Sequence, residues 1–270
     1  MHKTCYEFIF EPQKKYDEDF LTLLEINFDV VSINLLDDGK EQAVAYSEEK
    51  IDFVCELKYE VKKLESENWL KDYVIKFKAF SVENFMIYGQ HQKKAPKTNK
   101  TLLQIYAATA FGSNHPTTVM CIKHICDLHK QGFNPKSILD MGTGSGLLSL
   151  VASKLWPNAK ITACDIDEEA VIVTRGNFEN NNIKQAEVFQ SDGYENVTNK
   201  FDLILANILA NPLIEMAEDA YKHINKDGYI VLSGFNGDQT NWVAEEYTKQ
   251  GFIKKKQKTK QGWRALLCMS

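Results

Sequence analysis

A glycine-rich turn near the middle of the sequence is the first stretch whose residues could do chemistry. Apolar residues from Ser137 onward are typical of a short strand, and Gly142, Gly144 and Gly146 follow before an amphipathic helix near Leu147. Glycines there permit a tight turn, a close backbone approach to a ligand and close packing of the helix on the strand. The turn therefore indicates a nucleotide-like ligand, although a loop that binds nothing has the same composition.

Acidic residues that follow the next two strands limit the kinds of ligand that could bind. Asp165 and Asp167 follow a strand at residues 160–163, at about the 20-residue spacing of a carboxylate that holds ribose hydroxyls. Asp192 ends a later strand, so it would meet Asp165 at the carboxyl edge of the sheet. A phosphate-binding P-loop would need a lysine after the turn, and this lysine is absent. An NAD site remains open on these residues alone.

A third cluster, Asn207-Ile208-Leu209-Ala210, ends another buried strand. Ligands of open α/β sheets bind beyond the carboxyl ends of the strands, so Asn207 would lie where a substrate binds. Its amide and the neighbouring carbonyls accept hydrogen bonds and would suit an amine. In the alternative interpretation Asn207 is a turn residue and Pro212 starts a helix.

A helix start at His115-Pro116-Thr117-Thr118 precedes an apolar run with helical periodicity. The first-turn amides of a helix are unpaired and can bind an anion. In the alternative, Thr117 caps this helix and nothing binds there.

The elements that position these residues alternate between strand and helix, which predicts an α/β protein with an open, mostly parallel sheet covered on both faces. We expect strands at residues 137–141, 160–163, 189–192, 201–206 and 229–233, and helices at 168–180, 212–224 and 241–250. Residues 251–269 are expected to form two further strands joined by a basic turn at 254–260.

The first part of the sequence predicts a separate, small α+β domain over residues 1–66, with a strand at 6–10, a helix at 17–26 and a hairpin at 30–45. Residues 51–64 are interpreted as a strand that passes into a helix. Residues 67–100 are predicted to be a linker helix and loop, because Trp69, Tyr73, Phe77 and Phe80 recur at helical spacing before a polar stretch. The ligand-binding domain would then be 101–270.

Composition excludes several classes of protein. A hydrophobic share of 44% predicts a folded chain, and a net charge of −5 argues against nonspecific binding of nucleic acid. Neither a signal peptide nor a membrane span is expected. The six cysteines have no metal-like spacing, so we expect free thiols in a reducing cytoplasm and no metal site.

These motifs together resemble the PrmA family of methyltransferases, which use S-adenosylmethionine to methylate amino groups of protein eleven of the large ribosomal subunit. The resemblance runs from about Trp69 to the C terminus, and it rests on Ala110-Phe111-Gly112, His115-Pro116-Thr117-Thr118, the glycine turn with Asp140, Asp165-Ile166-Asp167 and Asn207-Ile208-Leu209-Ala210. It implies a Rossmann-like, seven-stranded methyltransferase domain, with the small N-terminal domain in the place of the family's substrate-recognition domain.

The resemblance also implies roles for single residues. The cofactor S-adenosylmethionine would contact Thr118, Gly142, Gly144, Asp165, Asp192 and Asn207. Asn207 would be the catalytic residue, accepting a hydrogen bond from a substrate amine that attacks the methyl group in line. His115 is the nearby candidate base, and we expect it to matter less than alignment of the reactants.

Two departures from the family pattern bear on the substrate. The loop at residues 111–115 lacks the second glycine of the usual form and is one residue shorter, and the N-terminal domain is the least recognisable part. Related enzymes methylate lysines of other proteins, including an electron-transfer flavoprotein subunit, and a non-catalytic cofactor-binding module is a further alternative. We expect a cytoplasmic monomer with a protein substrate, no membrane contact and no sequence-specific binding of nucleic acid.

Overall fold

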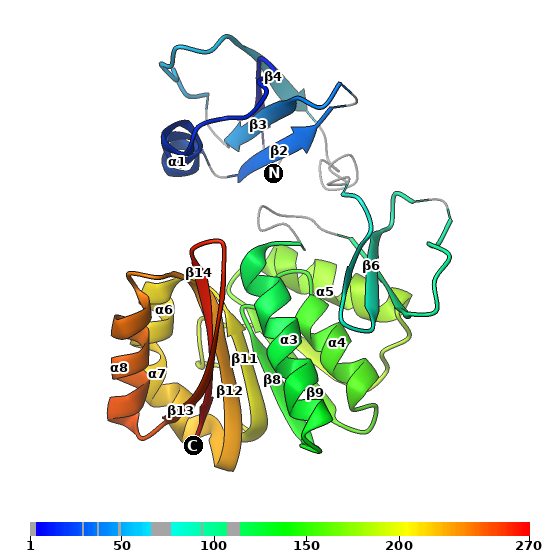
Figure 1. Cartoon of the computed structure of the whole chain (residues 1–270), viewed down its shortest axis with the longest axis vertical. Helices are drawn as coiled ribbons and strands as arrows, with labels where there is room; N and C mark the ends of the chain where they lie inside the picture. Colours follow the sequence, from blue (N-terminus) through cyan, green and yellow to red (C-terminus); the bar gives the residue numbers. More distant parts are fainter. Residues whose placement is uncertain are drawn as a thin grey trace. The chain divides into compact units, whose positions relative to one another are not determined.

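A computed structural model describes the chain in two compact units, Met1–Val74 and Ile75–Ser270 (Figure 1). The described residues are 4–28, 30–36, 38–47, 50–65, 77–92, 94–106 and 114–270.

In its described residues, the first unit forms a four-stranded antiparallel sheet and helix α1, which agrees with the predicted small α+β domain. Its strand order is β2-β3-β1-β4, and Asp17 caps the helix by accepting a hydrogen bond from the backbone of Phe20. The elements are β1 (Thr4–Phe10), α1 (Glu18–Asn27), β2 (Val30–Leu35), β3 (Glu41–Ser47) and β4 (Tyr59–Glu65).

The helix that was expected toward residue 64 is wrong, because residues 59–65 form strand β4. This strand pairs with β1 along its whole length, from Phe10 opposite Tyr59 to Thr4 opposite Glu65. Pairing with β1 satisfies the backbone of β4, and this long-range partner decides between two local patterns that the sequence left open.

Aromatic rings fill the core of the first unit. Phe8 and Phe10 lie on the same face of β1 and are fully buried. The ring of Phe8 meets Phe28 edge-on at 4.8 Å, and that of Phe10 meets Phe53 edge-on at 5.9 Å. This edge-to-face geometry is the favoured one for aromatic pairs, so the cluster both excludes water and orients the helix on the sheet.

The second unit contains a seven-stranded sheet in the order β10-β9-β8-β11-β12-β14-β13, which confirms the predicted seven-stranded fold. The first five strands of this order run parallel, while β14 is antiparallel to both of its neighbours. The strands are β8 (Ser137–Met141), β9 (Lys160–Asp165), β10 (Ala186–Gln190), β11 (Phe201–Asn207), β12 (Ile224–Asn236), β13 (Ile253–Lys260) and β14 (Trp263–Met269).

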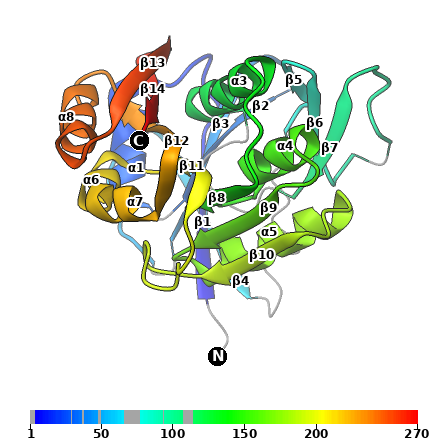
Figure 2. The same ribbon diagram turned by 90° about the horizontal axis from the view of Figure 1, so that it is seen from below.

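Helices cover both faces of this sheet, as expected (Figure 2). Alternate residues of each strand enter two separate cores: Ile138 of β8 packs with one set of helices, and the next residue, Leu139, packs with the other. The first set is α3 (Pro116–Lys130), α4 (Leu147–Leu155) and α5 (Glu168–Asn180). The second set is α6 (Ala210–Glu215), α7 (Ala217–His223) and α8 (Thr240–Gln250), so the helix expected at 212–224 is divided at Met216.

The predicted linker of residues 67–100 requires correction. From Ile75 on the chain belongs to the second unit, and it forms a small sheet of β5 (Phe80–Val82), β6 (Phe85–Gly89) and β7 (Thr101–Ile105). Phe85 and Ile87 are buried against the first set of helices, and this burial stabilises the small sheet. The polar residues nearby in the sequence had led to the prediction of a loop. Trp69 and Tyr73 lie outside the described residues.

The basic turn expected at residues 254–260 is wrong, because these lysines lie within strand β13. The turn is the residue pair Gln261 and Gly262, both with positive φ, as a two-residue hairpin requires. Lys256 and Lys258 both donate to Asp127 of α3, at 2.7 and 2.8 Å, so they secure the outer strand to the helix layer.

Among the residues that the structure describes, no helix is long and apolar enough to cross a membrane. The same described residues contain no group of three or more side chains that could hold a metal ion.

The aromatic core predicts that the two units can be destabilised separately. We expect Phe10→Ala to lower the free energy of unfolding of the first unit by about 3–5 kcal/mol, because a buried ring leaves a cavity. Hydrogen exchange should accelerate in β1, β3 and β4 and stay unchanged in β8 and β11. Leu23→Ala, at an exposed position of α1, serves as the control. Faster exchange throughout both units would contradict independent folding.

Candidate active site

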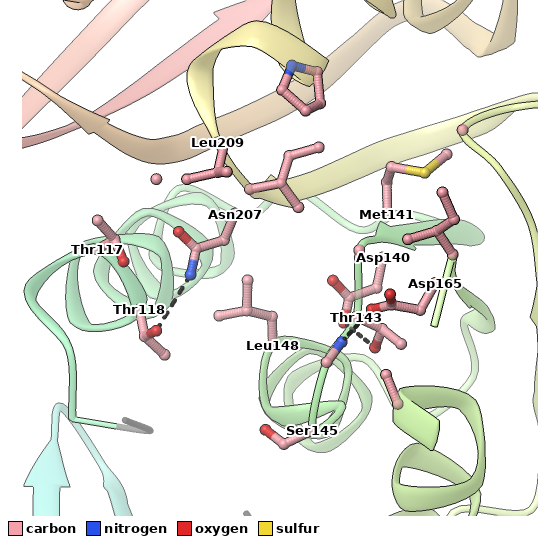
Figure 3. A pocket seen from close by; sticks show the side chains of 18 of the residues that line it. Thr117, Thr118, Asp140, Met141, Thr143, Ser145, Leu148, Asp165, Asn207 and Leu209 are labelled. Carbon is pink, nitrogen blue, oxygen red and sulfur yellow. Dashed lines mark hydrogen bonds between the residues drawn. The ribbon is translucent and has the colours of Figure 1, made fainter. Parts of the chain in front are cut away.

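A cavity of about 590 Å³ opens at the carboxyl ends of the parallel strands (Figure 3). It lies at the switch point of the sheet, where the chain runs outward from β8 to β9 in one direction and to β11 in the other. All six residues predicted from the sequence line it: Thr118, Gly142, Gly144, Asp165, Asp192 and Asn207. Carboxyl ends of parallel strands meet at one edge, which explains why residues so far apart in sequence converge.

The glycine turn is tied to the end of β9. The backbone amides of Gly142 and Thr143 donate to the carbonyl of Cys164, at 2.9 and 3.0 Å. Gly142 has a φ of +67°, and a Cβ there would lie 2.2 Å from the side chain of Ile208. Glycine is therefore required by both conformation and space, so the turn can follow the strand closely.

Asp165 accepts one backbone hydrogen bond on each carboxylate oxygen. The Gly144 amide donates to Oδ2 at 2.8 Å, and the Asp167 amide donates to Oδ1 at 3.1 Å. Burial raises the pKa of Asp165, and the Gly144 hydrogen bond opposes this rise. Since a carboxylate oxygen accepts two hydrogen bonds, each keeps capacity for a ligand hydroxyl.

Asp167, its acidic neighbour, has a structural role. It is the N-cap of α5 and accepts a hydrogen bond from the Glu169 amide at 2.9 Å. The two carboxylates that the sequence presented together are thus separated by the structure into a cavity residue and a helix cap.

Asp140 is a cavity residue that the sequence prediction did not select. Its Oδ2 accepts from the amide and hydroxyl of Ser149, at 3.1 and 2.7 Å, and from the Thr143 hydroxyl at 3.0 Å. Burial raises its pKa to about 6. The signal that could have found it is an acid at the end of an apolar strand, directly before the glycine turn.

Asn207 and Thr118 face one another across the cavity wall (Figure 3). The Asn207 Nδ2 donates to Thr118 Oγ1 at 3.2 Å. The other amide atom, Oδ1, is buried and has no hydrogen-bond partner among the residues that the structure describes. An unpaired buried acceptor is costly, so its presence beside a cavity indicates that a ligand donates to it.

His115 is the N-cap of α3, which corrects the alternative in which Thr117 caps this helix. Its Nδ1 lies 3.4 Å from the Thr117 amide and 2.7 Å from the Thr117 hydroxyl. Burial lowers the pKa of His115, and Lys260 lowers it further.

The ring of His115 meets Trp263 edge-on at 4.7 Å. Trp263 also lines the cavity and carried no signal in the sequence.

Asp192 follows β10 at the far side of the cavity and is exposed. The residue before it, Ser191, is fixed to the end of β9 because its amide donates to the carbonyl of Asp165 at 2.9 Å. The backbone next to Asp192 is therefore tied to the end of β9, which carries Asp165.

Gly234 is a further cavity residue that sequence reasoning missed. It has a φ of +101° and interrupts the pairing of β12 with β14, as a β-bulge does. A Cβ at this position would lie 2.1 Å from the carbonyl oxygen of Ile208. The bulge thus lets β12 pass against the backbone that follows Asn207.

Several proteins of known name are similar to this chain in sequence, and one of known structure is similar in fold. A ribosomal protein L11 methyltransferase from Staphylococcus haemolyticus is 37% identical over 200 residues, which are 73% of this chain and 62% of that protein. One from Campylobacter lari is 30% identical over 278 residues and covers 96% of this chain and 95% of its own length. The crystal structure of a ribosomal protein L11 methylase from Lactobacillus delbrueckii subsp. bulgaricus has a TM-score of 0.63 and 26% identity, over 71% of this chain and 97% of that one.

The match spans 62% of the Staphylococcus haemolyticus protein and 59% of a second relative, from Staphylococcus saprophyticus. The family model described as "Ribosomal protein L11 methyltransferase (PrmA)" matches residues 6–270, and this chain therefore belongs to that family.

Proposed function

We propose that this chain transfers methyl groups from S-adenosylmethionine to amino groups of ribosomal protein L11. Family membership and the names of the relatives support the reaction and the substrate. The single observation in the site that carries the proposal is the buried, unpaired Oδ1 of Asn207, a residue that lines the cavity and donates to Thr118. A neutral acceptor in this position suits an amine donor.

The residues present fit the cofactor. The spare acceptor capacity on both oxygens of Asp165 matches the two hydroxyls of a ribose. Gly142 and Gly144 bring the backbone close to the ligand, and no lysine is needed because this cofactor carries no phosphate. Asp192 would accept from the adenine amino group. When bound, S-adenosylmethionine supplies an electrophilic methyl group on a sulfonium.

The chain's own residues would prepare the amine for attack. A lysine amine with a pKa near ~10.4 is mostly protonated at neutral pH, and only the neutral form has a free lone pair. A dry site favours that form by desolvation. Asn207 Oδ1 would then accept an N–H of the neutral amine and aim its lone pair along the line of displacement. Alignment at ~3–3.5 Å is expected to supply much of the rate.

His115 fits a supporting role in this scheme. Its Nδ1 caps α3 and contacts Thr117, and burial lowers its pKa, which favours the neutral form of the ring. The first turn of α3 in turn presents Thr118 to Asn207. We assign recognition of the protein substrate to the first unit, residues 1–66 in the division expected from the sequence.

Transfer of label from S-adenosylmethionine tests both substrate and reaction. We expect purified protein with labelled S-adenosylmethionine to label L11 in isolated ribosomal proteins, at lysine side chains or the N-terminal amine, as identified by mass spectrometry. Label on another protein would overturn the substrate and keep the reaction. Absence of S-adenosylmethionine binding by calorimetry would overturn the reaction itself.

Removal of the unpaired acceptor should slow methyl transfer more than it weakens cofactor binding. We expect Asn207→Ala to lower kcat by about 100-fold, because the amine loses the group that orients it. Binding of S-adenosylhomocysteine should change much less. Asn211→Ala, at an exposed position outside the cavity lining, is the matched control. Equal methyl incorporation by the Asn207 variant and this control would refute the catalytic role.

The close approach of β12 gives a separate prediction. Gly234→Ala should shift the backbone at Ile208 and reduce methyl transfer at least about tenfold, since a displacement of the reacting groups by 1 Å is costly. Gly132→Ala is the matched control, because Gly132 also has positive φ (+83°) but open space around its Cβ position. Both variants carry the φ strain, and Gly234→Ala should lose more stability than Gly132→Ala because its Cβ also meets the backbone of Ile208. Activity of the Gly234 variant equal to that of the control would show that the contact has no catalytic consequence.

A further inference from the structure

Asn177, on α5, is fully buried, and its side-chain amide makes three hydrogen bonds to backbone groups. Its Oδ1 accepts from the amide of Tyr106 at 2.7 Å. Its Nδ2 donates to the carbonyls of Tyr106 and Ser145, at 2.9 and 2.8 Å. One side chain thus joins two segments that are far apart in the chain: the end of β7 and the glycine turn.

Asn181, one helical turn later, makes the same kind of contact to β7 but does not contact the glycine turn. Its amide exchanges two hydrogen bonds with the backbone of Gln104, accepting at 3.1 Å and donating at 2.6 Å. Residues four apart on a helix rise by about 6 Å, and residues two apart on a strand advance by about 6.6–6.8 Å. The two asparagines therefore match Gln104 and Tyr106 and act as a substitute strand along the edge of β7.

Only Asn177 extends this link to the cavity. Ser145 lines the cavity and belongs to the glycine turn. From the same helix, the Thr174 hydroxyl donates to the Gly144 carbonyl at 3.0 Å. Helix α5 thus holds two successive carbonyls of the turn, one by a side chain that is itself fixed by β7.

We propose that Asn177 is a positioning residue that holds the glycine turn in its cofactor-binding conformation by joining the Ser145 carbonyl to the end of β7. This inference rests on the proposed function, since it concerns the seat of the same cofactor. The chemistry of the residue explains its type: two donors and one acceptor are needed within one short side chain. Aspartate of the same size lacks the donors, and alanine lacks all three groups.

The test compares Asn177→Ala with Asn181→Ala, which loses the same kind of contact to β7 but none to the glycine turn. We expect both variants to melt at lower temperatures than the parent chain. Only Asn177→Ala should bind S-adenosylhomocysteine about tenfold more weakly by calorimetry. In the unliganded protein, hydrogen exchange at residues 144–147 should accelerate in this variant and not in Asn181→Ala.

Asn177→Asp provides a second variant that keeps side-chain size and the acceptor for the Tyr106 amide. It should show the same faster exchange at residues 144–147, because its carboxylate faces the Ser145 carbonyl without a proton to donate. Equal affinity and exchange for the Asn177 and Asn181 variants would overturn the positioning role. Failure of the parent chain to bind S-adenosylhomocysteine would instead overturn the proposed function, while the exchange measurement would still decide the role of Asn177.

Discussion

The space around Ile208 is the constraint on which the site depends. A Cβ at position 142 would lie 2.2 Å from its side chain, and one at position 234 would lie 2.1 Å from its carbonyl oxygen. Two glycines, one directly after β8 and one within β12, thus allow the chain segments at the ends of β8, β11 and β12 to converge on one residue. Asn207 directly precedes that residue, so its position is set by backbone contacts on both sides and not by its own side chain alone.

The polar side chains of the cavity near Ile208 differ in how many of their hydrogen-bonding groups are paired within the protein. Asp140 and Asp165 accept hydrogen bonds from backbone and hydroxyl donors of the protein itself. Such bonds lock the two side chains before any ligand arrives. Asn207 is locked by its donor atom only, through Thr118, and its acceptor is left for a partner. The cavity wall is therefore preorganised, and the acceptor of Asn207 is its buried neutral group that lacks a partner among the described residues.

The sequence predicted best where local pattern and long-range structure agree. Helix α5 occupies residues 168–180 as expected, because its acidic N-cap and apolar periodicity both favour the same boundaries. Prediction failed where a distant partner decided the outcome. Strand β4 is stabilised by its pairing with β1. Strands β5 and β6 are stabilised by burial of residues such as Phe85 and Ile87 in a core that could not be predicted from the local composition.

The candidate site shows the same division. Asp165 and Asn207 follow recognisable strands, so the sequence could predict that they lie at the same edge of the sheet, and both line the cavity. Gly234 and Trp263 were missed, because each acts through a contact with a residue far away in the chain: Ile208 for the glycine and His115 for the indole. No local pattern distinguishes a glycine in a bulge from one in an ordinary strand.

The arrangement of charge in the cavity accounts for how a cation and a neutral amine could share it. The carboxylates of Asp140 and Asp165 lie together on one side, and the uncharged pair of Asn207 and Thr118 lies on the other (Figure 3). Carboxylates favour a positively charged ligand group, whereas a buried neutral acceptor favours an amine that has lost its proton. Burial lowers the pKa of His115, which favours the neutral form of its ring on the second side. Under the proposed reaction, the cationic cofactor would occupy the acidic side and the attacking amine the neutral one, and this separation is what methyl transfer to a lysine requires.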